Sequence, residues 1–133
     1  MKYMLDTNIC IYIIKKKPLE VINRLMKMRV SDVCISSITL SELEYGVEKS
    51  ERRDQNKVAL AEFIAPIEVC SYDHHVATYY GKIRSHLEKK GQLLGSLDML
   101  IAAHALALQM VLVTNNVREF KRISDLKVEN WVK

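Results

Sequence analysis

Short apolar runs alternate along the chain with longer stretches in which apolar residues recur at helical spacing. The runs are too short for helices, and the run at residues 33–35 is also β-branched, which favours strands. They lie at residues 2–5, 33–35, 67–70, 111–113 and 128–132. The longer stretches predict helices at residues 8–15, 18–29, 38–49, 58–64, 76–90 and 97–110, and then a short helical piece ending at Phe120.

The stretch at residues 97–110 is apolar on nearly every face, which predicts a helix buried in the interior. Strands that alternate with helices call for a mainly parallel sheet covered by helices on both faces. The sequence therefore predicts a three-layer α/β fold with four to five strands. A length of 133 residues suits a single domain over residues 1–133.

Local signals place several boundaries. Pro18 suits the start of a helix, Asp73 is a good N-cap, and Gly91 suits a helix end. Residues 50–56 are polar and separate two helices, so we expect them to be the most exposed part of the chain.

The net charge is +4, and basic residues gather in clumps, which suits a polyanionic partner but equally a solvated surface. Cys10, Cys34 and Cys70 are odd in number and lie within apolar strings, as expected for core residues in a reducing cytosol. No signal peptide and no run of membrane-spanning length is evident. The expected location is the cytoplasm.

Asp6 directly follows the first predicted strand. In an open α/β sheet, ligands collect beyond the carboxyl ends of the strands, which makes this acid a site candidate. Glu42, Asp98 and Glu119 hold comparable positions, at or just past turns that lead into helices. The hypothesis of a site requires that these four carboxylates meet in space.

Each acid also has a structural explanation. Asp6 can cap a helix, and Glu42 completes the segment 39–42, a capping box in which the acid reaches back to the backbone. Asp98 suits the first turn of its helix, although the buried helix that follows makes an unpaired carboxylate there expensive. Glu119 can form a surface ion pair, and the neighbouring pair at 115–116 can be turn formers.

Convergence of the four acids would require a divalent cation or bound protons, because like charges at short range repel. A donor set of oxygens alone points to Mg²⁺ or Mn²⁺. The histidines offer no rival site, and we interpret them as surface or packing residues: His74, His75, His86 and His104.

Four segments carry a family resemblance: LDTN at residues 5–8, SSITLSEL at 36–43, DMLIAAHA at 98–105 and LVTNNVREF at 112–120. In this order and spacing they resemble the PIN-domain nucleases, and more closely the VapC toxins of bacterial toxin–antitoxin pairs. The resemblance covers nearly the whole chain and implies a small parallel-sheet α/β fold. It also implies an acidic pocket that holds Mg²⁺ or Mn²⁺ and cuts single-stranded RNA.

The resemblance carries the catalytic role over to Asp6, Glu42, Asp98 and Glu119, with the metal on Asp6 and Asp98. Many PIN domains have an aspartate at the position of Asn116, whereas this chain has its acid at Glu119, so either residue could complete the site. We expect short polar side chains to support the acids, with Thr7 and Asn8 orienting Asp6. The further polar supports are Thr114, Asn115 and Asn116.

Similarity to enterobacterial-type VapC toxins implies cleavage of initiator tRNA in the anticodon stem-loop and inhibition of translation. It also implies a VapB-type antitoxin whose tail lies in a groove near the first helices, which Ile9, Tyr12 and Ile13 could line. Core packing is the simpler explanation of these three residues. A homodimer, and assemblies that bind operator DNA only through the antitoxin, follow by the same analogy, with no membrane partner.

Other protein classes fit less well. Phosphatases of the haloacid dehalogenase type need a second acid where Asn8 stands, and a receiver domain needs a further acid and a late lysine that are not evident. The main alternative is a degenerate PIN domain that binds RNA or a protein without catalysis.

Overall fold

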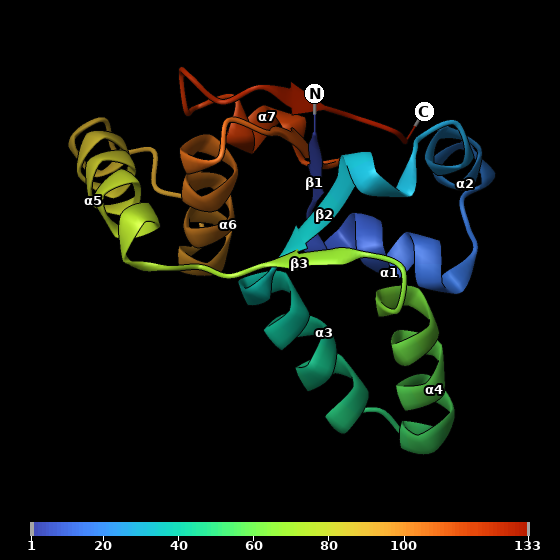
Figure 1. Ribbon diagram of the computed structural model, residues 1–133. Coiled ribbons are helices and arrows are strands. Elements are labelled where there is room, and N and C mark those ends of the chain that lie inside the picture. Colours follow the sequence, from blue (N-terminus) through green and yellow to red (C-terminus); the bar gives the residue numbers. More distant parts are fainter. Residues whose placement is uncertain (1, 133) are drawn as a thin grey trace.

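The computed structural model describes residues 2–132, in which a parallel sheet lies between two groups of helices (Figure 1). The strands are β1 (Tyr3–Leu5), β2 (Val33–Ser36), β3 (Glu68–Cys70), β4 (Val111–Val113) and β5 (Val128–Glu129). The helices are α1 (Thr7–Lys15), α2 (Leu19–Met26), α3 (Ser37–Glu48), α4 (Arg53–Ile64), α5 (His74–Lys89), α6 (Ser96–Ala107) and α7 (Val117–Phe120), with a 3₁₀ turn at Val30–Asp32. The strand order is β3-β2-β1-β4-β5, and all four pairings are parallel.

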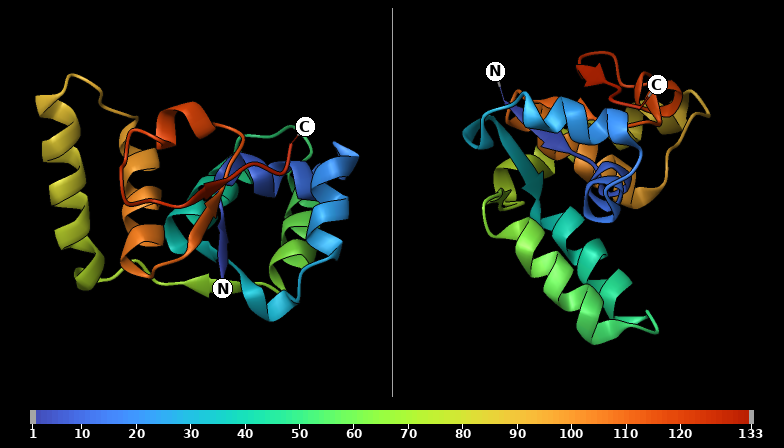
Figure 2. Two further views of the ribbon diagram at one scale, coloured as in Figure 1. Left: turned by 90° about the horizontal axis from the view of Figure 1, so that it is seen from above. Right: turned by 90° about the vertical axis from the view of Figure 1, so that its right-hand side faces the viewer.

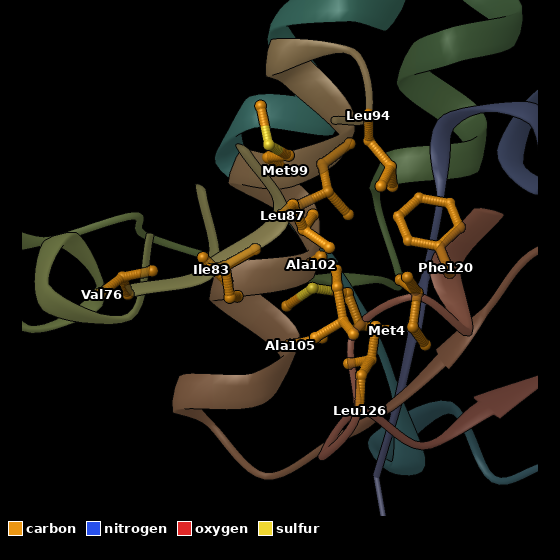
Figure 3. Packing of buried hydrophobic residues seen from close by; sticks show 14 of the residues in the cluster. Met4, Val76, Ile83, Leu87, Leu94, Met99, Ala102, Ala105, Phe120 and Leu126 are labelled. Carbon is orange, nitrogen blue, oxygen red and sulfur yellow. The ribbon is translucent and has the colours of Figure 1, made fainter. Parts of the chain in front are cut away.

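The sheet separates two hydrophobic cores, because successive side chains of a strand point to opposite faces. Met4 and Leu112 join the core formed with α5, α6 and α7 (Figure 3), whereas the next residues, Leu5 and Val113, join the core beneath α1 to α4. Both faces are therefore covered, and the strands contain few polar residues. The predicted three-layer α/β architecture with a parallel sheet is confirmed.

The topology places a switch point at the central strand. From β1 the chain goes to β2 on one side of the sheet, and it later returns to β4 on the other side. Ligands of open α/β sheets bind where the strand order reverses in this way, beyond the carboxyl ends of the strands. Asp6 follows β1 at this point.

Several local predictions are confirmed. Helix α6 is buried along most of its length, and Asp73 caps α5, since its side chain accepts a hydrogen bond from the His75 N–H. Gly91, just past α5, has a φ of 65°, which glycine adopts without strain. Residues 51–58 are all exposed, and they form the tip and first turns of the α3–α4 hairpin, which projects away from the sheet (Figure 2).

Some predicted boundaries are wrong. Helix α2 ends at Met26 rather than near residue 29. Met28 lies past the end of the helix but still packs against the core, so the apolar pattern in the sequence continues beyond the helix. Helix α4 begins at Arg53, within the segment predicted to be a polar connection, since its exposed first turns carry no apolar periodicity. Helix α6 ends at Ala107, and β5 covers only Val128–Glu129. Among residues 2–132, no helix combines the length and apolar character needed to cross a membrane.

Candidate active site

Asp6 lies at the carboxyl end of β1 and is also the N-cap of α1. Its Oδ1 accepts a hydrogen bond from the Ile9 N–H at 2.9 Å, and the residue is only 6% exposed. The capping explanation is therefore correct for this residue. One carboxylate oxygen of Asp6 therefore serves the cap.

The pKa of Asp6 shows what surrounds that carboxylate. Burial raises it from 3.8 to about 6, while hydrogen bonds from the Thr114 hydroxyl and the Ile9 N–H oppose this rise. The charges of Asp98 and Glu42 raise it further. Acids of α6 and α3, far away in the sequence, thus come within electrostatic range of Asp6.

Glu42 is held by Thr7. The Thr7 hydroxyl donates to Glu42 Oε1 at 2.7 Å, across the junction of α1 and α3. The predicted capping box is wrong, because Ser36 rather than Thr39 is the N-cap of α3, and Glu42 lies in the middle of that helix. Thr7 consequently orients Glu42 and not Asp6 as predicted, while the side chain of Asn8 is exposed.

Asp98 lies in the first turn of α6, as predicted, and is partly buried. Burial raises the pKa of its carboxyl, and the charges of Glu42 and Glu119 add to the effect. The pKa of Asp98 is therefore raised by the acids of α3 and α7, and the pKa of Asp6 is raised by those of α6 and α3. Together these influences link all four candidate acids.

The segment after β4 carries the fourth acid. Thr114 is fully buried, and its Oγ1 accepts a hydrogen bond from the Asn116 N–H at 2.9 Å. Asn116 precedes the one-turn helix α7, in which Glu119 is partly buried. The Asn115 side chain donates to the Tyr12 hydroxyl at 2.9 Å, so it fastens this segment to α1.

The donor chemistry of this cluster suits a hard cation. All four side chains offer carboxylate oxygens, and within residues 2–132 none of them forms an ion pair with a basic side chain. The same part of the chain contains no group of three acids, histidines or cysteines close enough to enclose an ion. A cation held by two carboxylates and several waters, as is usual for Mg²⁺, fits such an open arrangement.

The histidines lie elsewhere. His74, His75 and His86 are exposed on α5, whereas His104 is fully buried in α6, where its Nδ1 lies 2.8 Å from Ser36 Oγ. These positions agree with the prediction that the four histidines are surface or packing residues. No pattern in the sequence signals the contact between His104 and Ser36, since these residues are far apart in the chain.

Comparison with known proteins identifies the family. A PIN domain model matches residues 3–126. The chain belongs to the PIN-domain family. Within this family, ribonuclease VapC2 of Haemophilus influenzae is 45% identical over 132 residues, or 99% of each chain. The tRNA(fMet)-specific endonuclease VapC of Salmonella typhimurium is 47% identical over 131 residues, or 98% of each chain. These relatives place the chain among the VapC ribonucleases.

A solved structure supports the same assignment to the VapC branch of the PIN-domain family. The complex of VapBC2 from Rickettsia felis with a DNA fragment from its promoter contains a chain of 46% identity that superposes with a TM-score of 0.93. The match covers 99% of this chain and 100% of the other. The fold and the order of its elements are therefore those of a VapC toxin.

Proposed function

We propose that this chain is the toxin of a type II toxin–antitoxin pair and hydrolyses RNA with Mg²⁺, for which Mn²⁺ can substitute. The observation that carries the proposal is the electrostatic influence of Asp98 and Glu42 on Asp6, and of Glu42 and Glu119 on Asp98, because these acids come from four separate segments. A structural cap or a surface ion pair does not require three acidic companions. A metal-dependent nuclease site requires several acids, because it must hold a cation beside a phosphodiester.

Asp6 and Asp98 would hold the ion, since the Asp6 carboxylate lies at the switch point and is influenced by Asp98. Bound there, Mg²⁺ supplies a Lewis acid that lowers the pKa of a water and offsets charge on the phosphate. Glu42, oriented by Thr7, and Glu119 complete the acidic pocket and orient the attacking water. In-line attack of this water leaves a 5′-phosphate and a 3′-hydroxyl.

The proposed substrate is initiator tRNA, cut in the anticodon stem-loop, with inhibition of translation as the result. Two relatives that are 44% and 47% identical bear the name tRNA(fMet)-specific endonuclease. Exposed basic residues supply contacts to the flanking phosphates, which position the RNA without reading its sequence. The site of action is the cytoplasm, and residues 1–133 act as one PIN domain.

The proposed partner is a VapB-type antitoxin, and the chain offers it an apolar groove. The groove, of about 310 Å³, lies between α1, α3 and α4. Its walls include Ile11, Ile14, Leu43 and Val47. Glu42 lines the groove as well, so a bound segment can reach an acid of the proposed site. Homodimerisation, and operator binding through the antitoxin, complete this proposal.

The groove corrects one prediction. Ile9, Tyr12 and Ile13 do not line it, because they lie on another side of α1, where Ile9 is fully buried in the core. Core packing, the alternative explanation, agrees with their positions, since Ile9 belongs to the core and Tyr12 and Ile13 pack against it. The groove side of α1 presents Ile11, Ile14 and Lys15 instead.

The decisive experiment incubates the purified protein with tRNA and Mg²⁺, with and without a chelator. We expect cleavage that stops on chelation and resumes when Mg²⁺ or Mn²⁺ is restored. A degenerate PIN domain would bind RNA and leave it intact under all conditions. Sequencing the 5′ ends of RNA from expressing cells tests the substrate, and scattered mRNA cuts with intact initiator tRNA would refute it.

Loss of the Thr7 hydroxyl should weaken cleavage without affecting the fold. Thr7→Val keeps the side-chain shape but removes the donor to Glu42 Oε1, and we expect a rate about 10- to 100-fold lower. Thr7→Ser retains the hydroxyl and should stay close to wild type. Single-turnover cleavage of tRNA measures both variants, and equal rates for valine and serine would show that the contact is dispensable.

Comparison of Glu119→Gln with Asn116→Ala decides which residue completes the site. Because Glu119 contributes to the raised pKa of Asp98, we expect Glu119→Gln to lose most of the cleavage activity. Asn116 interacts with Thr114 through its backbone N–H, which alanine retains, so Asn116→Ala should be mild. The opposite order of tRNA cleavage rates would assign the role to Asn116.

A further inference from the structure

A buried hydrogen bond joins the two helices that carry Glu42 and Asp98. Ser36 is the last residue of β2 and the N-cap of α3, and His104 lies in the second half of α6. Both residues are fully buried. Ser36 Oγ accepts the Ile38 N–H at 3.0 Å and lies 2.8 Å from His104 Nδ1, so a single hydroxyl serves the start of α3 and the side of α6.

The position of this contact relates it to the acids. Ser36 lies a little under two turns before Glu42, and His104 lies the same distance after Asp98. Within residues 2–132, His104 supplies the one side-chain hydrogen bond that joins α6 to another element. Otherwise α6 is held by apolar contacts, which tolerate sliding better than a hydrogen bond of fixed length and direction.

Stability alone does not account for a histidine at this place. Its neighbours Ala103 and Ala105 are fully buried, and burial lowers the pKa of His104, against the influence of the Asp73 carboxylate and the Ser71 carbonyl. The Nε2 atom has no partner that meets hydrogen-bond distance and angle within the described residues. A buried imidazole whose Nε2 meets no acceptor with good hydrogen-bond geometry, the nearby Ser71 carbonyl included, costs free energy that an apolar residue would avoid.

We propose that His104 is a positioning residue of the nuclease site, and that its hydrogen bond to Ser36 fixes α6 against α3 and so sets the spacing of Asp98 and Glu42. This inference rests on the proposed function. The rings of His104 and Tyr72 form an edge-to-face pair, with their centroids 5.5 Å apart, which limits rotation of the imidazole. Rotation or loss of the ring would let the first turn of α6, with Asp98, move relative to α3.

The test compares His104→Leu with His104→Asn. Leucine fills a similar volume without a hydrogen-bonding atom, whereas the amide of asparagine can occupy the place of Nδ1. Two quantities are measured: Mn²⁺ binding to the apo-protein by calorimetry, and the rate constant of tRNA cleavage at saturating RNA. We expect His104→Leu to weaken Mn²⁺ binding and to slow cleavage, each by about 10-fold, and His104→Asn to recover most of both losses.

A matched control separates positioning from general destabilisation. Ile83→Val shortens a buried side chain of α5 in the same core, so it should lower the melting temperature and leave Mn²⁺ binding unchanged. If His104→Leu binds Mn²⁺ and cleaves tRNA like this control, the inference is wrong. Should His104→Leu fail to fold, Ser36→Ala removes the same bond from the other side, and wild-type Mn²⁺ binding by Ser36→Ala would equally overturn it.

The outcomes also distinguish this inference from the proposed function. Absence of chelator-sensitive cleavage by the wild-type protein would refute the nuclease proposal itself. Normal wild-type cleavage with unchanged Mn²⁺ binding in His104→Leu would refute only the positioning role. Both substitutions break the bond between Ser36 and His104, and Ser36→Ala in addition removes the acceptor of the Ile38 N–H. The double variant Ser36→Ala/His104→Leu should therefore bind Mn²⁺ about as weakly as Ser36→Ala alone, and a loss equal to the sum of the two single losses would contradict the pairing.

Discussion

Asp6→Asn should abolish RNA cleavage and at the same time stabilise the metal-free protein. The variant removes a carboxylate proposed to hold the ion, and we expect the cleavage rate to fall by at least about 100-fold. Asparagine is as good an N-cap as aspartate, so its side-chain oxygen can still accept the Ile9 N–H and α1 keeps its start. The variant therefore separates the charge of Asp6 from its structural contact.

The gain in stability follows from the raised pKa of Asp6. Its value of about 6, against 3.8 in an ordinary environment, means that the folded state binds the proton more tightly than the unfolded state. This contribution favours folding below pH 3.8 and is lost as the pH rises through about 6. At pH 7.5 the charge thus costs about 3 kcal/mol, of which the variant should recover about 1–2 kcal/mol.

Urea unfolding in the presence of a chelator at pH 7.5 and at pH 4 measures this effect. The variant should be more stable than the wild type at pH 7.5, and the difference should shrink at pH 4. Asp73→Asn is the matched control, because Asp73 caps α5 through the same kind of bond but lies outside the acidic cluster. Asp73→Asn should show neither the gain in stability at pH 7.5 nor the loss of RNA cleavage. A destabilised Asp6→Asn at pH 7.5 would contradict the explanation that burial, together with the charges of Asp98 and Glu42, makes the ionised Asp6 carboxylate costly.

The pattern of apolar and polar residues was sufficient to predict the architecture, and where the acids stand relative to the strands and helices. The strands are short and apolar on both faces, so their number and parallel arrangement follow from the alternation with helices. Asp6 and Asp98 were predictable because each stands at a chain reversal next to a buried element. The hypothesis required the four acids to meet in space, and it stays a prediction; its support is that Asp98 and Glu42 raise the pKa of Asp6, and that Glu42 and Glu119 raise the pKa of Asp98.

Side-chain partners were not predictable, since they depend on how helices pack in space. The sequence assigned Glu42 to a capping box and Thr7 to Asp6, whereas the crossing of α1 and α3 pairs Thr7 with Glu42. The bond between Ser36 and His104 joins residues 68 positions apart, and no local pattern signals it. Helix starts in exposed segments, such as Arg53 in α4, lack the apolar periodicity on which prediction depends.

Phe120→Ala should be among the most destabilising substitutions in the chain and should also impair the site. Phe120 is 1% exposed and lies in the core near Leu94 and Met4 (Figure 3). Removal of a buried aromatic ring costs about 3–5 kcal/mol, through lost apolar burial and the cavity left behind. Helix α7 has only four residues and cannot be stable alone, so the ring anchors the segment that carries Glu119.

Equilibrium urea unfolding and tRNA cleavage well below the midpoint of unfolding measure the two consequences. Leu126→Ala is the matched control, because Leu126 belongs to the same core but follows α7. It should lose stability by about 2–4 kcal/mol and retain cleavage, whereas Phe120→Ala should lose both, and Phe120→Leu should recover part of each. If Phe120→Ala cleaves tRNA as fast as Leu126→Ala, the ring stabilises the core without positioning Glu119, and the anchoring of the fourth acid must lie in the contact between Thr114 and Asn116.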